Sequence, residues 1–159
     1  MKNFSLRHLI EVGIVAGLYA ALVHFFAPIS FTVIQFRIPE FMKPFVIYRK
    51  HLIWAMAIGV GVANLLSPFG GPWELIWMPV MNLAGGYLTW LLGQRLNPYI
   101  AAGFYAIWLS VAVAVMLMMV AGLPFFAALS TILPAQLVLV VGGVPIVQTI
   151  NRRLIKIAR

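Results

Sequence analysis

The chain alternates between long apolar stretches and short breaks rich in proline, glycine and charge. Most of these stretches hold about the 20 residues that a helix needs to cross a bilayer. The breaks are typical of turns, because proline and glycine interrupt helices. The pattern predicts an all-α integral membrane protein, a bundle of six transmembrane helices spanning about residues 8–27, 39–48, 51–66, 74–92, 99–120 and 125–150.

The second of these spans is the least regular. Six polar or helix-breaking residues interrupt the stretch 29–48, which predicts a loop followed by a short helix over 39–48: Gln35, Arg37, Pro39, Glu40, Lys43 and Pro44. Pro134 and Pro145 interrupt the sixth span, so we expect it to be kinked.

Composition strengthens the membrane assignment. Of 159 residues, 64% are hydrophobic and only 9% are charged, with a mean hydropathy of +1.03. Soluble domains carry about 25% charged residues. We therefore expect a single transmembrane domain over residues 1–159, in contact with the lipid bilayer.

The residue types present argue against catalysis. The chain has no cysteine, no aspartate, and three isolated histidines without the spacing of metal ligands. It also lacks the glycine-rich loop with lysine that binds nucleotide phosphates. We expect no enzyme, no cofactor and no metal, so any energy for transport comes from a partner.

The net charge of +8 reflects the way the chain crosses the membrane and does not indicate a nucleic-acid partner. Cytoplasmic loops of membrane proteins are enriched in Lys and Arg. If both termini are cytoplasmic, only Arg37 and Lys43 lie outside. Nine cations then lie inside: Lys2, Arg7, Arg49, Lys50, Arg95, Arg152, Arg153, Lys156 and Arg159.

In that topology the polar residues of the spans gather in the outer half. Glu74 and Asn82 share one face of the fourth span, and Asn64 lies near the outer end of the third. Polar groups at membrane depth commonly mark a substrate path, so we expect an outward-facing binding cup. Gln136 is a weaker candidate.

Each candidate also has a structural interpretation. Glu74 suits the N-terminus of a helix, and Arg37 and Glu40 can neutralise each other. Asn64 and Asn82 can join helices by hydrogen bonds. Trp73 fits the interfacial aromatic belt or a stacking platform for a planar ligand.

Small residues at a spacing of four form a ridge on the first span. Gly13 with Gly17, and Ala16 with Ala20, allow another helix to approach closely. The ridge serves either a partner subunit or packing within the chain.

Several motifs resemble one transporter family. Ala27-Pro28-Ile29-Ser30-Phe31, Gln35-Phe36-Arg37-Ile38-x-Glu40, Gly61-x-Ala63-Asn64-Leu65-Leu66 and Gly71-Pro72-Trp73-Glu74 are similar to the QueT family. These are substrate-binding (S) components of energy-coupling factor (ECF) transporters in the prokaryotic cytoplasmic membrane. The resemblance covers residues 9–92, and implies six helices with both termini cytoplasmic.

The resemblance also implies a substrate and partners. The substrate is a queuosine precursor, a 7-deazaguanine base such as preQ1 or queuine, and the partners are a transmembrane T subunit and two ATPase subunits. Gln35, Arg37 and Glu40 would cover the ligand, Asn64 and Glu74 would line the pocket, and Ala16 and Ala20 would dock on the T subunit.

The ligand's chemistry suits these groups. We expect Glu74 to accept the paired N–H donors of a guanine-like edge, Trp73 to stack on the ring, and Glu40 to balance any aminomethyl cation. Two alternatives remain: an S component for another vitamin, and a scaffold subunit of a cell-envelope complex.

Overall fold

The structure is a computed structural model that describes residues 5–32, 35–67 and 71–157. This part of the chain is helical and contains no strand. Its elements are α1 (Leu6–Phe25), α2 (Ala27–Ser30), the 3-10 helix η1 (Ile38–Met42), α3 (Phe45–Tyr48), α4 (Leu52–Asn64), the π-helix η2 (Trp73–Trp77), α5 (Met78–Gly93), α6 (Pro98–Ala121), α7 (Phe125–Gln136), the π-helix η3 (Leu137–Val141) and α8 (Gly142–Ile157).

Within the described residues, four helical stretches are long and apolar enough to cross a membrane: Leu6–Phe25, Trp73–Gly93, Pro98–Ala121 and Phe125–Lys156. They coincide with the first, fourth, fifth and sixth predicted spans, which confirms the all-helical membrane protein. The third is the 13-residue α4, which rises about 20 Å and falls short of a hydrocarbon core of about 30 Å.

The second predicted span divides into η1 and α3. Pro39 and Pro44 lack the amide hydrogen that a continuous helix would need at each position, so the chain turns between the two short helices. The six-span count and the cytoplasmic termini remain predictions. Lys2 and Arg159, and residues 68–70 of the predicted turn over 67–72, lie outside the described residues.

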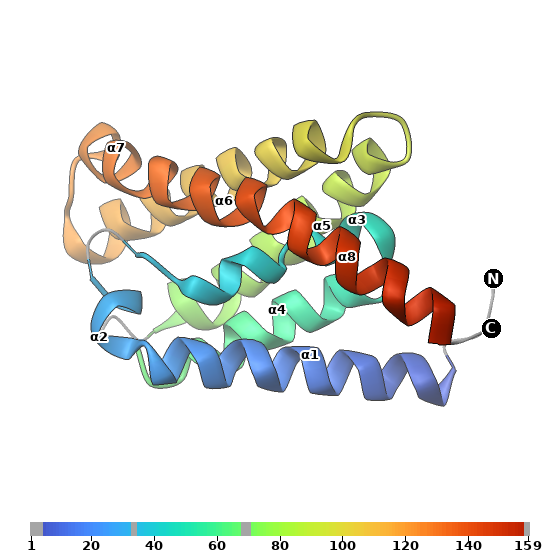
Figure 1. The fold of residues 1–159 in the computed structure, drawn as a ribbon. Helices are drawn as coiled ribbons and strands as arrows, with labels where there is room; N and C mark the ends of the chain where they lie inside the picture. Colours follow the sequence, from blue (N-terminus) through green and yellow to red (C-terminus); the bar gives the residue numbers. More distant parts are fainter. Residues whose placement is uncertain (1–4, 33–34, 68–70, 158–159) are drawn as a thin grey trace.

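Short η1 and α3 lie inside the bundle (Figure 1). η1 contacts α1 on one side and η3 and α8 on the other, while α4, α5, α6 and α7 follow one another in contact around it. The first turn of α1 and the last turn of α8 lie at the same end of the bundle.

The distribution of polarity is the reverse of that in a soluble protein. Large apolar side chains such as Leu6, Phe25 and Phe126 are exposed on the outer surface. Among the described residues, four Arg, Lys and Glu side chains are buried in the interior: Arg37, Glu40, Lys43 and Glu74. This arrangement suits a lipid environment, where the outer surface is apolar and charges need partners inside.

A second cluster of charge closes the end where α1 begins. The Glu11 carboxylate contacts Arg7 (3.1 Å), Arg49 (2.8 Å) and His51 (2.7 Å). Arg49 also donates a hydrogen bond to Oδ1 of Asn151 at 2.9 Å. These bonds join α1, the turn before α4, and α8.

The ridge of small residues on α1 divides between two surfaces. Ala16 and Ala20 are buried, and a Cβ on Gly59 of α4 would lie 3.1 Å from the Ala16 carbonyl oxygen. Gly13 and Gly17 are exposed, with nothing within 4 Å of a Cβ added to either. The methyl groups of Ala16 and Ala20 therefore pack inside the chain, and their docking on a T subunit stays a prediction.

Gly143 of α8 allows η1 to reach its central position. A Cβ at Gly143 would lie 2.2 Å from the carbonyl oxygen of Phe41. We predict that Gly143→Ala displaces η1 and destabilises the fold by about 1–3 kcal/mol, as overpacking does. Thermal unfolding of the purified protein in detergent measures the effect.

The adjacent glycine is a matched control. Gly142 is exposed and has nothing within 4 Å of an added Cβ, so Gly142→Ala should leave the unfolding temperature unchanged or slightly raised. Equal unfolding temperatures for the two variants would contradict the close approach of α8 to η1.

Candidate functional site

A short segment, residues 35–43, carries three of the four charged side chains of the site. Its backbone bonds repeat at a spacing of three: the Glu40 N–H donates to the Arg37 carbonyl (2.9 Å) and the Lys43 N–H to the Glu40 carbonyl (3.0 Å). Side chains three apart eclipse each other in 3-10 geometry. Arg37, Glu40 and Lys43 therefore share one side of the segment, and all three are buried.

Gln35 begins this segment in a strained conformation. Its φ of 52° is unusual for a residue with a side chain, and its N–H and carbonyl oxygen bond to Thr32 and Arg37. Strain of this kind concentrates at functional sites. Here it turns the buried Gln35 side chain into the same interior space as the charges.

Lys43 lies at the centre of the polar cluster. Its side chain is 1% exposed, its ammonium donates to Oδ1 of Asn82, and it lies 3.5 Å from Oε2 of Glu40. The ring centroids of Tyr19 and Tyr105 are each 5.5 Å from the ammonium. Tyr19 also donates its hydroxyl to Oε1 of Glu40, so α1, η1, α5 and α6 meet at one buried charge.

Arg37 makes the second charged contact. Nη1 donates to Oδ1 of Asn64 at 2.9 Å, and Nη2 lies 3.7 Å from Oε1 of Glu74. The Asn64 amide in turn donates to the backbone oxygen of Glu74 at 3.0 Å. The π-turn η2 places Glu74 here; Pro79, two residues into α5, supplies no amide hydrogen to the preceding turn, which widens.

These groups surround a small internal cavity. Its volume is about 10 Å³, which is room for about one water molecule and far below the roughly 300 Å³ of ordinary ligand pockets. The site is thus closed by its own side chains. Its walls are Gln35, Arg37, Glu40, Lys43, Val60, Met78, Asn82, Leu109, Val113 and Gln136.

Several buried polar atoms at the site have no hydrogen-bond partner. They include Nε2 of Gln35, Oε1 of Gln136 and both carboxylate oxygens of Glu74. An unpaired buried donor or acceptor costs about 1–3 kcal/mol. A ligand that pairs with them would recover that free energy.

Six of the predicted site residues gather in this cluster: Gln35, Arg37, Glu40, Asn64, Glu74 and Asn82. Trp73 does not join them. It is 36% exposed, meets Trp77 edge-on at 5.6 Å, and borders an outer groove beside Pro72. Neighbouring residues of a helix point in different directions, so an inward Glu74 turns Trp73 outward.

Lys43, Tyr19 and Tyr105 are members of the cluster that the sequence does not predict. From the sequence, Lys43 is only a cation of the outer side. The signal was present in its spacing, because Arg37, Glu40 and Lys43 recur every third residue in a segment that contains Pro39 and ends before Pro44. Nothing in the sequence distinguishes the two tyrosines from other aromatic residues of the spans.

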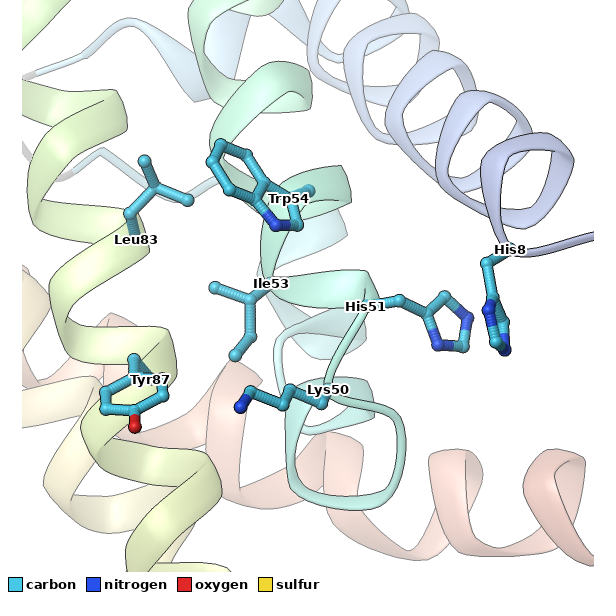
Figure 2. A pocket seen from close by; sticks show the side chains of 7 residues that line it. All are labelled: His8, Lys50, His51, Ile53, Trp54, Leu83 and Tyr87. Carbon is cyan, nitrogen blue, oxygen red and sulfur yellow. The ribbon is translucent and has the colours of Figure 1, made fainter. Parts of the chain in front are cut away.

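A larger pocket opens near the end of the bundle where α1 begins, between α1, α4 and α5 (Figure 2). It has a volume of about 550 Å³. His8 and His51 stack at 4.4 Å, and the Lys50 ammonium lies 4.3 Å from the Trp90 ring centroid. Its polar side chains are partly exposed, whereas those of the small cavity are buried. The buried cluster is the better candidate for selective binding.

Comparison with known families identifies the protein class. The model of the QueT transporter family matches residues 9–152, which is most of the chain. The chain belongs to the QueT transporter family. This confirms the resemblance inferred from the motifs and extends it beyond residue 92. No curated protein and no solved structure matches the chain.

Membership of the QueT family agrees with the architecture. A multi-pass membrane protein with a buried polar cluster suits a transporter, and the family implies the substrate-binding component of an ECF-type transporter. The match includes all the cluster residues, from Tyr19 to Gln136.

The Arg37–Glu74 pair offers a test of the cluster. We predict that Arg37→Met destabilises this QueT-family protein by roughly 3–5 kcal/mol, because it leaves a carboxylate buried without a counter-charge. Glu74→Gln should destabilise it for the corresponding reason, because the Arg37 guanidinium is then buried without a counter-charge. The double variant should lose less than the sum of the two single losses, as measured by unfolding in detergent.

The exposed Arg7 is a control, since its contact with Glu11 lies on the surface. Arg7→Met should change stability by less than about 1 kcal/mol. Strict additivity of the two buried substitutions would show that Arg37 and Glu74 do not interact.

Proposed function

We propose that this protein is the S component of an ECF importer and that it binds a 7-deazaguanine base, a queuosine precursor, in the buried polar cluster. The observation that carries the proposal is the set of unpaired buried donors and acceptors beside the cavity, on residues that the family match covers. A guanine-like ring presents a dense set of hydrogen-bonding groups of both kinds, so it can pair with them together.

In this proposal Gln35 and Gln136 form hydrogen bonds to the ring from the wall of the cavity. The Gln35 amide donates to a ring acceptor, and the Gln136 oxygen accepts from a ring N–H. Glu74 accepts the paired N–H donors of the guanine edge. Since Arg37 lines the cavity and Glu74 does not, this contact requires the guanidinium to move aside.

The geometry gives Trp73 and Asn82 other roles than ligand contact. Trp73 lies outside the cluster and receives no stacking role. Asn82 holds Lys43 and is itself fixed by Tyr105 and by the Met78 carbonyl. In the proposal it therefore orients the charged groups.

Transport requires energy that this chain does not supply. We propose that a T subunit and two ATPase subunits are its partners in a prokaryotic cytoplasmic membrane, with the cluster in the outer half of the bilayer. The exposed Gly13–Gly17 face of α1 is the proposed contact with the T subunit, because the absence of side chains lets a partner helix approach closely.

Ligand binding is tested by thermal stabilisation of the purified chain with 7-deazaguanines, guanine and B vitamins. A ligand that binds the folded state raises the unfolding temperature as its concentration exceeds Kd. We predict a shift with 7-deazaguanines alone, and a loss of affinity of about tenfold or more in Gln136→Leu, from one lost hydrogen bond.

Thr89→Val is the matched control, because Thr89 is buried and unpaired but lies outside the cavity lining. Its affinity should equal that of the wild type. If only a B vitamin raises the unfolding temperature, the protein is still an S component but its substrate is a vitamin. If no compound raises it, the result favours the scaffold alternative.

Complex assembly is tested separately. We predict that replacing Gly13 and Gly17 together by Leu prevents co-purification with the T subunit and ATPases while ligand binding stays intact. Gly103→Leu on α6, which also has nothing within 4 Å of an added Cβ, should assemble normally. Normal assembly of the double variant would exclude this face of α1.

A further inference from the structure

Lys50, in the turn before α4, is a cation with no acidic partner among the described residues. Two of the three acidic residues, Glu40 and Glu74, belong to the buried cluster, and the third, Glu11, is bound by three basic side chains. None of the three forms a salt bridge with the Lys50 ammonium in the part of the chain that the structure describes. The positive charge of Lys50 is therefore available to an anion from outside the chain.

Aromatic side chains hold this ammonium in place. It lies 4.3 Å from the ring centroid of Trp90 and 5.2 Å from that of Tyr87, both on α5, and cations are attracted to the faces of such rings. Figure 2 shows the Lys50 side chain extending toward Tyr87, with Trp54 of α4 farther along the same pocket. Trp and Tyr are enriched at the depth of the lipid headgroups, so the ammonium lies where a headgroup phosphate can reach it.

An apolar groove leads away from the ammonium along α4 and α5. The pocket of about 550 Å³ beside Lys50 shares Trp54 and Leu83 with a second hollow of about 410 Å³, whose lining continues to Leu65 and Leu75. The 13 residues of α4 rise about 20 Å. An acyl chain spans half of the hydrocarbon core, about 15 Å, so the groove is long enough to hold one.

The groove supplies shape, whereas Lys50 supplies selectivity. Ala57 and Gly61 lie in its lining and have the small side chains that leave room for a hydrocarbon chain. Because lipid tails are as apolar as the side chains of a membrane helix, seating the tail distinguishes poorly between lipids. The charge at the head of the groove distinguishes them by their headgroups.

We propose that the groove between α4 and α5 binds one anionic phospholipid, with its phosphate on Lys50 and an acyl chain along Trp54 and Leu83. Glu11 does not line the pocket, so no carboxylate in the lining repels the phosphate. A zwitterionic headgroup brings a cation of its own next to Lys50, whereas phosphatidylglycerol brings only negative charge. The surface is separate from the buried cluster, so the proposal does not depend on which substrate the protein carries.

The test compares two lipids with the same acyl chains on the purified full-length protein: dioleoylphosphatidylglycerol, which is anionic, and dioleoylphosphatidylcholine, which is zwitterionic. Native mass spectrometry in detergent measures the dissociation constant of the first bound lipid. We expect the wild type to bind the anionic lipid at least about fivefold more tightly, the effect of about one lysine at an anionic membrane surface. Inorganic phosphate, which has no chain to seat in the groove, should not compete with it.

Substitution of the lysine should remove the preference. In Lys50→Met the two dissociation constants should become equal, because the headgroup loses its cation. Arg95→Met is the matched control: Arg95 is an exposed cation in the turn after α5 and does not line the groove. Its removal changes the net charge by the same amount and should leave the preference for the anionic lipid intact.

Each contrary result overturns a stated part of the proposal. Equal binding of the two lipids by the wild type would exclude an anionic lipid and leave the groove to a helix of a partner subunit. A preference that persists in Lys50→Met, or that disappears equally in Arg95→Met, would show that Lys50 does not hold the headgroup. Competition by inorganic phosphate would show a site for a free anion. The wild-type comparison of lipids decides the headgroup class even if a variant does not fold.

Discussion

The neutralisation of charge inside an apolar bundle is the constraint on which the rest of this structure depends. Arg37, Glu40, Lys43 and Glu74 are buried where water cannot solvate them, so each must lie close to an opposite charge or a hydrogen-bonding group. Three of the four come from one nine-residue segment whose 3-10 spacing directs them to the same side. The longer helices contribute the partners: Tyr19 from α1, Asn64 from α4 and Asn82 from α5.

The bundle is shaped to admit this segment. Gly143 lets α8 lie against the backbone of Phe41, and the π-turn η2 brings Glu74 inward at the start of α5. A second π-turn, η3, follows Gln136 directly and precedes Pro145, which lacks the amide that a regular turn would use. Such turns recur at functional sites because they redirect side chains without ending the helix. The inward positions of Glu74 and Gln136 therefore depend on local departures from regular helix.

Much of the site could be predicted from topology, and the residues that could not be predicted were hidden for physical reasons. Hydropathy placed Asn64, Glu74 and Asn82 at one level of the bundle, and charge bias placed Arg37 beside them. Lys43 was missed because the sequence predicts a loop followed by a short helix over 39–48, and the three-residue spacing of Arg37, Glu40 and Lys43 acquires its meaning only once the segment adopts 3-10 geometry. The sequence also does not show which face of α1, Ala16–Ala20 or Gly13–Gly17, packs inside the chain. Lipid and protein interior are equally apolar surroundings for a membrane helix, so hydropathy does not distinguish the two faces.

The same pairing that makes the charges tolerable also closes the site. A cavity of about 10 Å³ holds no purine-like ring, so in the proposed function a ring enters only as segment 35–43 shifts and its polar groups exchange internal partners for ligand atoms. The segment suits such movement: 3-10 turns have poorer hydrogen-bond geometry than α-helices, and the strained Gln35 begins it. A ligand that pairs with the groups released by this shift stabilises the shifted segment, and one that leaves a charge unpaired does not. In the proposed function, selectivity and opening therefore depend on the same four charges.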